Sequence, residues 1–193
     1  MTPNPETFSA WPEEKKLLHD LIMTSPGDFV IEVGCYQGAT SQVLADACAI
    51  RRKTLVCIDP WNGEQDGSGG EQYAVFSKAT AQYRPIVRRC RSQDADVTPY
   101  LGKCALVFID GLHSYEGVKA DIAKFAPCCE KGGYLACHDV ADLGWPGVRQ
   151  AIAEHFAFNE HMTLHTLLYQ PSAEEVARYA HGVSGLAYWQ PKP

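Results

Sequence analysis

The chain has 193 residues, of which 46% are hydrophobic and 21% charged, the proportions of an ordinary globular protein. This length predicts a single domain, residues 1–193, with room for a sizeable core. The net charge of −6 argues against a nucleic-acid partner, which usually requires a basic surface. No apolar stretch approaches the roughly 18 residues needed to cross a membrane, and the N-terminus lacks the layout of a signal peptide. We therefore expect a cytoplasmic protein without a membrane partner.

Predicted helices and strands alternate along the chain, a pattern typical of a parallel sheet with helices on both faces. After a helical N-terminal extension, residues 1–27, the expected strands are 29–33, 55–58, 86–89, 105–109, 134–137, 163–169 and 186–189. The expected helices are 11–23, 39–49, 71–83, 114–125 and 146–156. The predicted fold class is therefore α/β, with a Rossmann-like, doubly wound and mostly parallel sheet of about seven strands.

A glycine-containing loop follows the first predicted strand. Gly34 and Gly38 allow the backbone to turn sharply and allow a ligand to approach without meeting a Cβ. Thr40 and Ser41 then open a helix whose unpaired N–H groups suit a carboxylate or a phosphate. The loop is therefore a candidate cofactor site.

An acid at the end of the second predicted strand supports the same interpretation. Asp59 stands about 20 residues beyond the loop, where nucleotide-binding folds place an acid on the ribose hydroxyls. Tyr36 occupies the position at which a dinucleotide fingerprint requires its second glycine, which disfavours a nicotinamide-dependent oxidoreductase but leaves it as an alternative. Pro60 and Trp61 follow the acid and form either an apolar wall near the adenine or ordinary packing.

Three segments resemble the motifs of one enzyme family. Residues 32–41 follow the pattern E-x-G-x-x-x-G-x-[ST]-[ST], which resembles motif I of class I S-adenosylmethionine (SAM)-dependent methyltransferases. Residues 109–121 contain I-D-G-x-H-S-Y-E-x-V-x-x-D, and residues 131–139 read K-G-G-Y-L-A-C-H-D. Both resemble the small O-methyltransferase-like families, which include the metal-dependent sugar O-methyltransferases of macrolide biosynthesis. The resemblance covers roughly residues 28–140.

The resemblance implies that the two last strands form a C-terminal antiparallel hairpin and that SAM is the cofactor. Glu32 would support the loop or the methionine end of SAM, Asp59 would accept the ribose hydroxyls, and Ser92 would read the adenine. The expected cofactor-binding residues are Glu32, Gly34, Tyr36, Gly38, Thr40, Ser41, Asp59, Pro60, Trp61, Ser92, Gln93 and Asp110.

Asp110 and His113 are the expected catalytic residues, because they follow the fourth strand at the edge where the reactive methyl group would lie. A histidine suits removal of a proton from an acceptor hydroxyl. Asp110 and Asp139 would meet across neighbouring strands and hold a divalent cation such as Mg²⁺. The metal-dependent relatives have two adjacent acids where this chain has His138 and Asp139. The predicted metal ligands are thus Asp110, His138 and Asp139, a set that tolerates transition metals. The alternative is no metal, with Asp110 supporting its loop and His138 bonded to a backbone carbonyl.

These inferences favour a SAM-dependent methyltransferase that acts on a hydroxyl of a small molecule, either a sugar or another natural product. A catalytically silent SAM-binding module remains a second alternative. The glycine-rich segment 62–70 is either an idle loop or a lid over the acceptor. The eight cysteines contain no C-x-x-C pair, so we expect free structural thiols. The oligomeric state stays open, with a homo-oligomer among the options.

Overall fold

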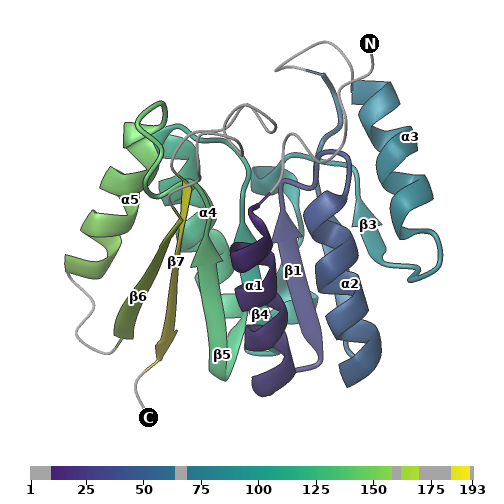
Figure 1. Ribbon diagram of the computed structural model, residues 1–193, viewed down its shortest axis with the longest axis horizontal. Coiled ribbons are helices and arrows are strands. Elements are labelled where there is room, and N and C mark those ends of the chain that lie inside the picture. Colours follow the sequence, from purple (N-terminus) through teal and green to yellow (C-terminus); the bar gives the residue numbers. More distant parts are fainter. Residues whose placement is uncertain (1–9, 64–68, 158–161, 170–183, 192–193) are drawn as a thin grey trace.

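The computed structural model describes residues 10–63, 69–157, 162–169 and 184–191 and forms one sheet with helices on both sides (Figure 1). Its seven strands are arranged in the order β3-β2-β1-β4-β5-β7-β6. The first five pair in parallel, and β7 runs antiparallel to both β5 and β6. The strands are β1 (Phe29–Val33), β2 (Thr54–Ile58), β3 (Ile86–Arg88), β4 (Cys104–Ile109), β5 (Cys129–Cys137), β6 (Met162–Tyr169) and β7 (Ser184–Pro191). The predicted Rossmann-like sheet and its closing antiparallel pair are confirmed.

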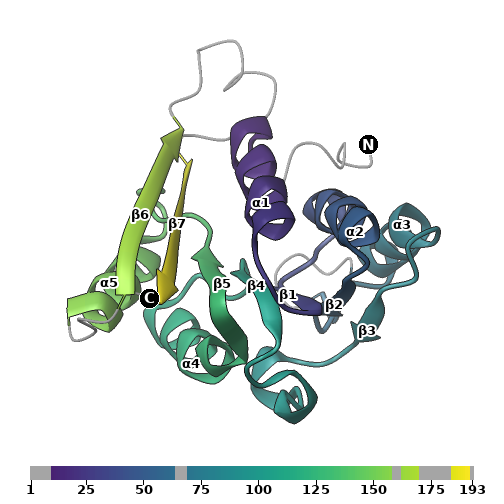
Figure 2. The same cartoon turned by 90° about the horizontal axis from the view of Figure 1, so that it is seen from below.

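The helices cover the sheet in two groups, which Figure 2 shows on opposite faces. They are α1 (Pro12–Thr24), α2 (Ala39–Arg51), α3 (Gly69–Thr80), α4 (Tyr115–Phe125) and α5 (Pro146–Ala157). Apolar side chains of α1, α2 and α3 pack on one face of the strands, and those of α4 and α5 pack on the other. The two central strands are therefore covered on both sides, and every residue of β4 is buried.

Strand β5 is longer than the sequence predicts, because two glycines allow its irregular first half to pair. The expected strand begins at Tyr134, whereas β5 begins at Cys129 and contains a register shift opposite β4. A Cβ on Gly133 would lie 2.4 Å from the carbonyl oxygen of Cys104, so only glycine permits this pairing. Glycine between hydrophobic residues indicates a turn in the sequence, but here it lies within a bulged strand.

Helix α3 also differs from its prediction. It begins at Gly69 and ends at Thr80, instead of running from Glu71 to Tyr83. The last two residues of the predicted lid, Gly69 and Gly70, therefore belong to a helix. Residues 64–68 of the predicted lid lie outside the described part of the chain.

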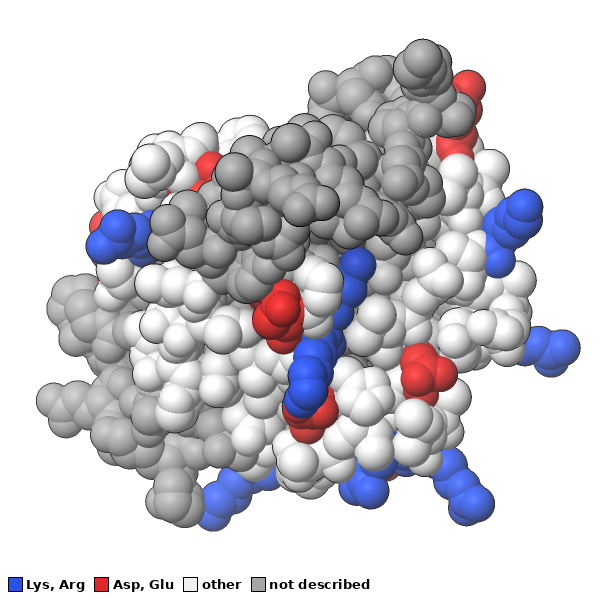
Figure 3. All heavy atoms as spheres, viewed as in Figure 1, with Lys and Arg blue, Asp and Glu red and all other residues white. Residues whose placement is uncertain are grey.

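Charged side chains are interspersed by sign on the face seen in Figure 3, without a continuous basic patch among the described residues in that view. Within the same described ranges, no helix is both long enough and apolar enough to cross a membrane. Arg88, Arg89 and Arg91 are close together in the sequence at the end of β3, where the Arg89 guanidinium stands 4.1 Å from the Tyr73 ring centroid.

Candidate active site at the carboxyl edge of the sheet

The loop between β1 and α2 depends on two glycines with left-handed backbone. Gly34 has φ +84° and Gly38 has φ +86°. A Cβ on Gly34 would lie 2.0 Å from the carbonyl oxygen of Asp110, and one on Gly38 would lie 3.0 Å from the Phe76 ring. The sequence interpretation assigned the space above these glycines to a ligand, whereas the neighbours observed are the backbone after β4 and a side chain of α3. Gly34 thus brings the loop into direct contact with the segment that carries Asp110.

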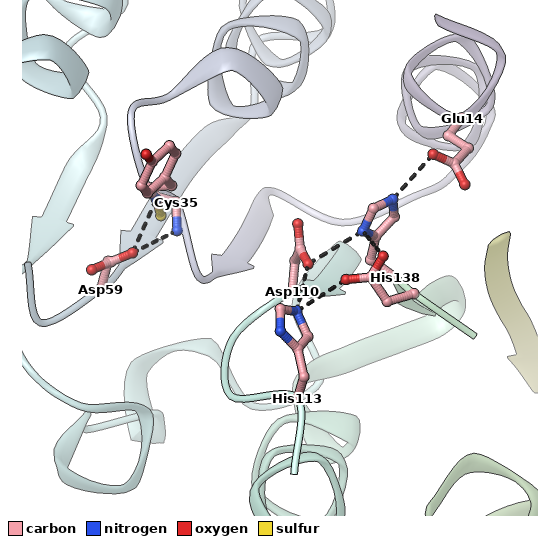
Figure 4. Close-up of polar contacts among 8 residues, drawn as sticks. Glu14, Cys35, Asp59, Asp110, His113 and His138 are labelled. Carbon is pink, nitrogen blue, oxygen red and sulfur yellow. Dashed lines mark hydrogen bonds and ion pairs between the residues drawn. The ribbon is translucent and has the colours of Figure 1, made fainter. Parts of the chain in front are cut away.

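Asp59 holds this loop in position. Its Oδ2 accepts hydrogen bonds from the N–H groups of Cys35 at 2.9 Å and Tyr36 at 3.0 Å (Figure 4). Its Oδ1 accepts the N–H of Trp61 at 2.7 Å. These bonds stabilise the unfavourable left-handed backbone of Tyr36, at φ +47°. A carboxylate has about four acceptor positions, and these three bonds occupy three of those of Asp59.

Glu32 lies beneath the loop and is fully buried, with 0% of its surface exposed. Burial raises its pKa to about 8, and the nearby Ser41 hydroxyl offsets part of this shift. Its Oε2 accepts the thiol of Cys57 at 3.7 Å, while Oε1 has no hydrogen-bond partner within the described chain. Glu32 is therefore protonated at neutral pH and supports the loop as a neutral acid.

Thr40 and Ser41, at the start of α2, are both buried. They therefore line the inner side of the loop rather than its solvent-facing side. The Ser41 hydroxyl has no hydrogen-bond partner within the described chain.

Trp61 packs inside the protein instead of forming an open wall. It is 3% exposed, and its Nε1 donates to the carbonyl oxygen of Tyr36 at 2.7 Å. Its ring contacts those of Tyr73 and Phe76 on α3. Of the two interpretations left open for this residue, the geometry favours packing. Pro60, next to it, is half-buried.

The predicted adenine-reading residues lie in a short turn after β3, Ser92–Asp94. Ser92 is half-buried and Gln93 is exposed. Burial raises the pKa of Asp121 on α4, and the Ser92 hydroxyl offsets part of this effect. The turn thus lies against α4, which packs on the face of the sheet opposite α1.

Four titratable side chains meet where β4 and β5 end (Figure 4). Ile109 pairs with Cys137 in the parallel register, so the residues that follow both strands reach the same edge. His113 Nε2 lies 3.4 Å from Asp110 Oδ1 and 3.1 Å from Asp139 Oδ2. His138 Nδ1 lies 3.3 Å from Asp110 Oδ1 and 3.2 Å from Asp139 Oδ1. Asp139 therefore lies between the two imidazoles.

This arrangement determines the protonation of the cluster. Burial by itself would lower the pKa of His113, but Asp110 and Asp139 raise it to about 10. The same two acids raise the pKa of His138 well above its usual value, again against the effect of burial. Burial acts to raise the pKa of each carboxyl, yet the two histidines hold both below their usual range. The two acids and the two imidazoles thus favour one another's charged forms.

The cluster also has the donor set of a divalent-cation site. Ligand atoms of Asp110, His113 and Asp139 lie within 4.8 Å of one another. Carboxylate oxygens with one imidazole suit Mn²⁺ or another transition metal, and Mg²⁺ through the carboxylates. The imidazole in this group of ligand atoms is that of His113. The sequence predicted His138 as the imidazole ligand instead. Both ring nitrogens of His138 face carboxylates, Nε2 that of Glu14 and Nδ1 that of Asp110.

Sequence reasoning missed one residue of this site, Glu14 on α1. Its carboxylate is 0% exposed, and Oε2 lies 3.0 Å from His138 Nε2. The same oxygen accepts the N–H of Trp11 at 2.8 Å. That second bond is an ordinary helix-start contact, and it is the only role that the local sequence indicates. The contact with His138 spans 124 positions of the chain and leaves no local signal.

The eight cysteines are free thiols, as predicted. A second group of ligand atoms, from Glu32, Cys35 and Cys57, also lies within 4.8 Å. Burial raises the pKa of each of these three groups, which keeps them protonated and neutral. This group is therefore part of the core beneath the loop.

Comparisons with known proteins agree with the observed fold. The chain resembles an O-methyltransferase from Bacillus cereus in complex with SAH (TM-score 0.71, 15% identity, covering 95% of this chain and 83% of that one). It resembles the O-methyltransferase TomG from Streptomyces achromogenes in complex with SAM (TM-score 0.66, 18% identity, coverage 96% and 82%). It also resembles apo CalS11, a TDP-rhamnose 3'-O-methyltransferase of calicheamicin biosynthesis (TM-score 0.64, 18% identity, coverage 92% and 77%).

At these identities the structural likeness establishes the fold. No curated protein matches the sequence. Residues 31–140, more than half of the chain, match the family described as Methyltransferase domain. The chain therefore belongs to this methyltransferase family.

Proposed function

We propose that this protein binds SAM at the loop between β1 and α2 and transfers its methyl group to a hydroxyl of a small molecule. The observation that carries the proposal is the contact between Gly34 and the backbone of Asp110, whose carbonyl oxygen would lie 2.0 Å from a Cβ on the glycine. This contact joins the cofactor loop to the acid and imidazole cluster. A methyl donor on the loop would therefore present its reactive end to groups that can orient an acceptor oxygen.

The acceptor side of the cluster has an apolar rim. The Trp145 ring centroid lies 4.9 Å from that of His113, and Trp145 is 46% exposed. Leu112 and Leu143 are also exposed, in the loops that follow β4 and β5. These side chains would contact the carbon skeleton of a sugar or another natural product while its hydroxyl faces the cluster.

His113 is the proposed general base. Its Nε2 holds a proton between Asp110 and Asp139, and a base must first lose that proton. A divalent cation held by the two carboxylates would supply positive charge that acidifies the acceptor hydroxyl and weakens the hold on the imidazolium proton. The Nε2 atom serves either as base or as metal ligand. We favour the base, with Asp110 and Asp139 holding the cation.

Two alternative functions, a nicotinamide-dependent oxidoreductase and a silent SAM-binding module, would place different demands on the site. In a nicotinamide-dependent oxidoreductase the pyrophosphate would press on the middle of the loop, where Tyr36 carries a side chain on a left-handed backbone. A silent SAM-binding module would bind SAM without turnover, although it would have no need for the acidic cluster. The geometry favours neither over a methyltransferase.

Calorimetry with SAM, S-adenosylhomocysteine and NADH tests the cofactor, and a screen of hydroxylated acceptors with SAM tests transfer. We expect SAM and S-adenosylhomocysteine to bind and NADH not to bind. Tight NADH binding without SAM binding would overturn the proposal. SAM binding without transfer to any acceptor would support the silent module. Activity that survives EDTA and does not respond to Mg²⁺ or Mn²⁺ would remove the metal and leave His113 as the base.

A further inference from the structure

The N-terminal helix α1 precedes the segment that matches the family, residues 31–140, yet one of its side chains reaches the candidate active site. Glu14 enters the core from the first turn of α1, and Figure 4 shows its carboxylate facing His138. Its Oε2 lies 3.0 Å from His138 Nε2. The helix therefore contributes a carboxyl group to the cluster at the ends of β4 and β5.

Local structure does not explain why this carboxylate is buried. A glutamate at this helix position can accept the N–H of Trp11 and still remain at the surface. Glu13, its neighbour, is exposed, whereas Glu14 is 0% exposed. Burying a carboxylate is unfavourable unless partners replace its hydration. His138 is a partner that Glu14 reaches only from this buried position.

The contact sets the orientation of the His138 ring. With Nε2 held by Glu14, the opposite nitrogen, Nδ1, faces Asp110 Oδ1 at 3.3 Å and Asp139 Oδ1 at 3.2 Å. The second carboxylate oxygen of Asp139 stays directed at His113. Asp139 itself has a left-handed backbone, φ +57°, which the surrounding contacts must stabilise.

We propose that Glu14 is a positioning residue of the active site, acting through His138 on the carboxylates of Asp110 and Asp139. Glu14 fixes the imidazole, and the imidazole holds the two acids at the spacing that a cation and an acceptor hydroxyl require. The catalytic part of this inference rests on the proposed function. The orientation of the His138 ring by Glu14 does not depend on that function, since it follows from contacts among side chains of this chain.

The test uses the variants Glu14→Ala and Glu14→Gln, with Glu13→Ala as the matched exposed control. Long-range ¹H–¹⁵N NMR reports the hydrogen bonding of the His138 ring, titration with Mn²⁺ reports the cation site, and kinetics separate kcat from the KM for SAM.

We expect Glu14→Ala to shift the His138 ring resonances and to weaken Mn²⁺ binding and kcat by about 10- to 100-fold, the range for groups that orient metal ligands. The KM for SAM should stay nearly unchanged. Glu14→Gln keeps an acceptor oxygen and should recover most of the loss, and Glu13→Ala should resemble the wild type.

A double variant separates this role from a purely structural one. The double variant combines Glu14→Ala with His138→Gln. If Glu14 acts through His138, the double variant should lose no more Mn²⁺ affinity or kcat than His138→Gln alone. Additive losses would overturn the proposal, and so would a Glu14→Ala variant that melts at a lower temperature but keeps the wild-type ring resonances, Mn²⁺ affinity and kcat. If Glu14→Ala does not fold, Glu14→Leu replaces it, since leucine fills the buried space but offers His138 no acceptor, and the same criteria apply. Absence of SAM binding in the wild type would refute the proposed function, while the resonances and the Mn²⁺ titration would still decide the role of Glu14.

Discussion

The candidate site has two halves along one edge of the sheet, the loop after β1 and the side-chain cluster after β4 and β5. Different kinds of interaction hold each half together. At the ends of β1 and β2, the loop is held by backbone N–H groups bonded to Asp59 and by the packing of Trp61 against α3. At the ends of β4 and β5, each of two imidazoles lies within 3.4 Å of two carboxylates. The first half depends on backbone conformation and the second on charge.

Under the proposed function, this difference separates cofactor binding from chemistry. A loop fixed by its own hydrogen bonds offers a cofactor a preformed surface at little entropic cost. A cluster whose protonation responds to its neighbours can hold and release a proton or bind a cation. Substitutions in the first half should therefore change cofactor affinity and stability, and substitutions in the second half should change turnover.

The largest effect is expected for His113→Ala. Loss of a general base lowers the rate by about 10²- to 10⁴-fold, while SAM affinity should remain, because the loop does not depend on this side chain. Steady-state kinetics and calorimetry measure the two quantities, with the exposed His165→Ala as control. Wild-type turnover in His113→Ala would show that the charged half does not carry the chemistry.

Gly34→Ala should affect both halves, since this glycine lies where they touch. The new Cβ would meet the Asp110 carbonyl oxygen at 2.0 Å on a left-handed backbone. We expect a loss in the free energy of unfolding of about 3 kcal/mol or more, measured by urea denaturation. Gly102→Ala is the control, because its φ is +65° but nothing lies within 4 Å of the added Cβ. That variant should lose only about 1 kcal/mol, and equal losses in both would mean that the Asp110 contact is unimportant.

Asp59→Ala should weaken SAM binding by roughly 1.5–3 kcal/mol, the scale of hydrogen bonds to a charged group. Because Asp59 also holds the loop N–H groups, stability should fall together with affinity. Calorimetry and thermal unfolding measure both, against Asp46→Ala on the exposed side of α2. Undiminished SAM affinity would place the cofactor elsewhere.

The last expected effect is a change in how the free energy of unfolding depends on pH, in the variant Glu32→Gln. Burial raises the pKa of Glu32 to about 8 from a usual value of 4.5. Below pH 4.5 the carboxyl is protonated in both the folded and the unfolded chain. As the pH rises toward 8 only the unfolded chain loses the proton, so this group destabilises the folded state progressively until the pH passes 8.

The neutral glutamine should therefore flatten the fall in stability between pH 4.5 and 8. The gain should grow with pH above 4.5 and level off near pH 8, where the folded chain also loses the proton. Urea denaturation of both proteins at a series of pH values measures the slope. Parallel pH profiles would show that Glu32 is ionised in the folded protein.

The sequence by itself determined the strand ends and the residue types placed there. The apolar runs before Gly34, Asp59 and Asp110 locate three neighbouring strands, because buried parallel strands leave a clear local pattern. The motif that begins at Asp110 also predicted the segment carrying His113. These features depend on residues close together in the chain, which is why they can be read without a structure.

Tertiary structure decided which groups meet. Nothing local indicates that Gly34 must be glycine because of Asp110, or that Trp61 packs against α3. The contact of Glu14 with His138 joins the first helix to the fifth strand's end. Charge states followed from the same contacts, since burial and neighbouring charges set the pKa of each group only after the chain has folded.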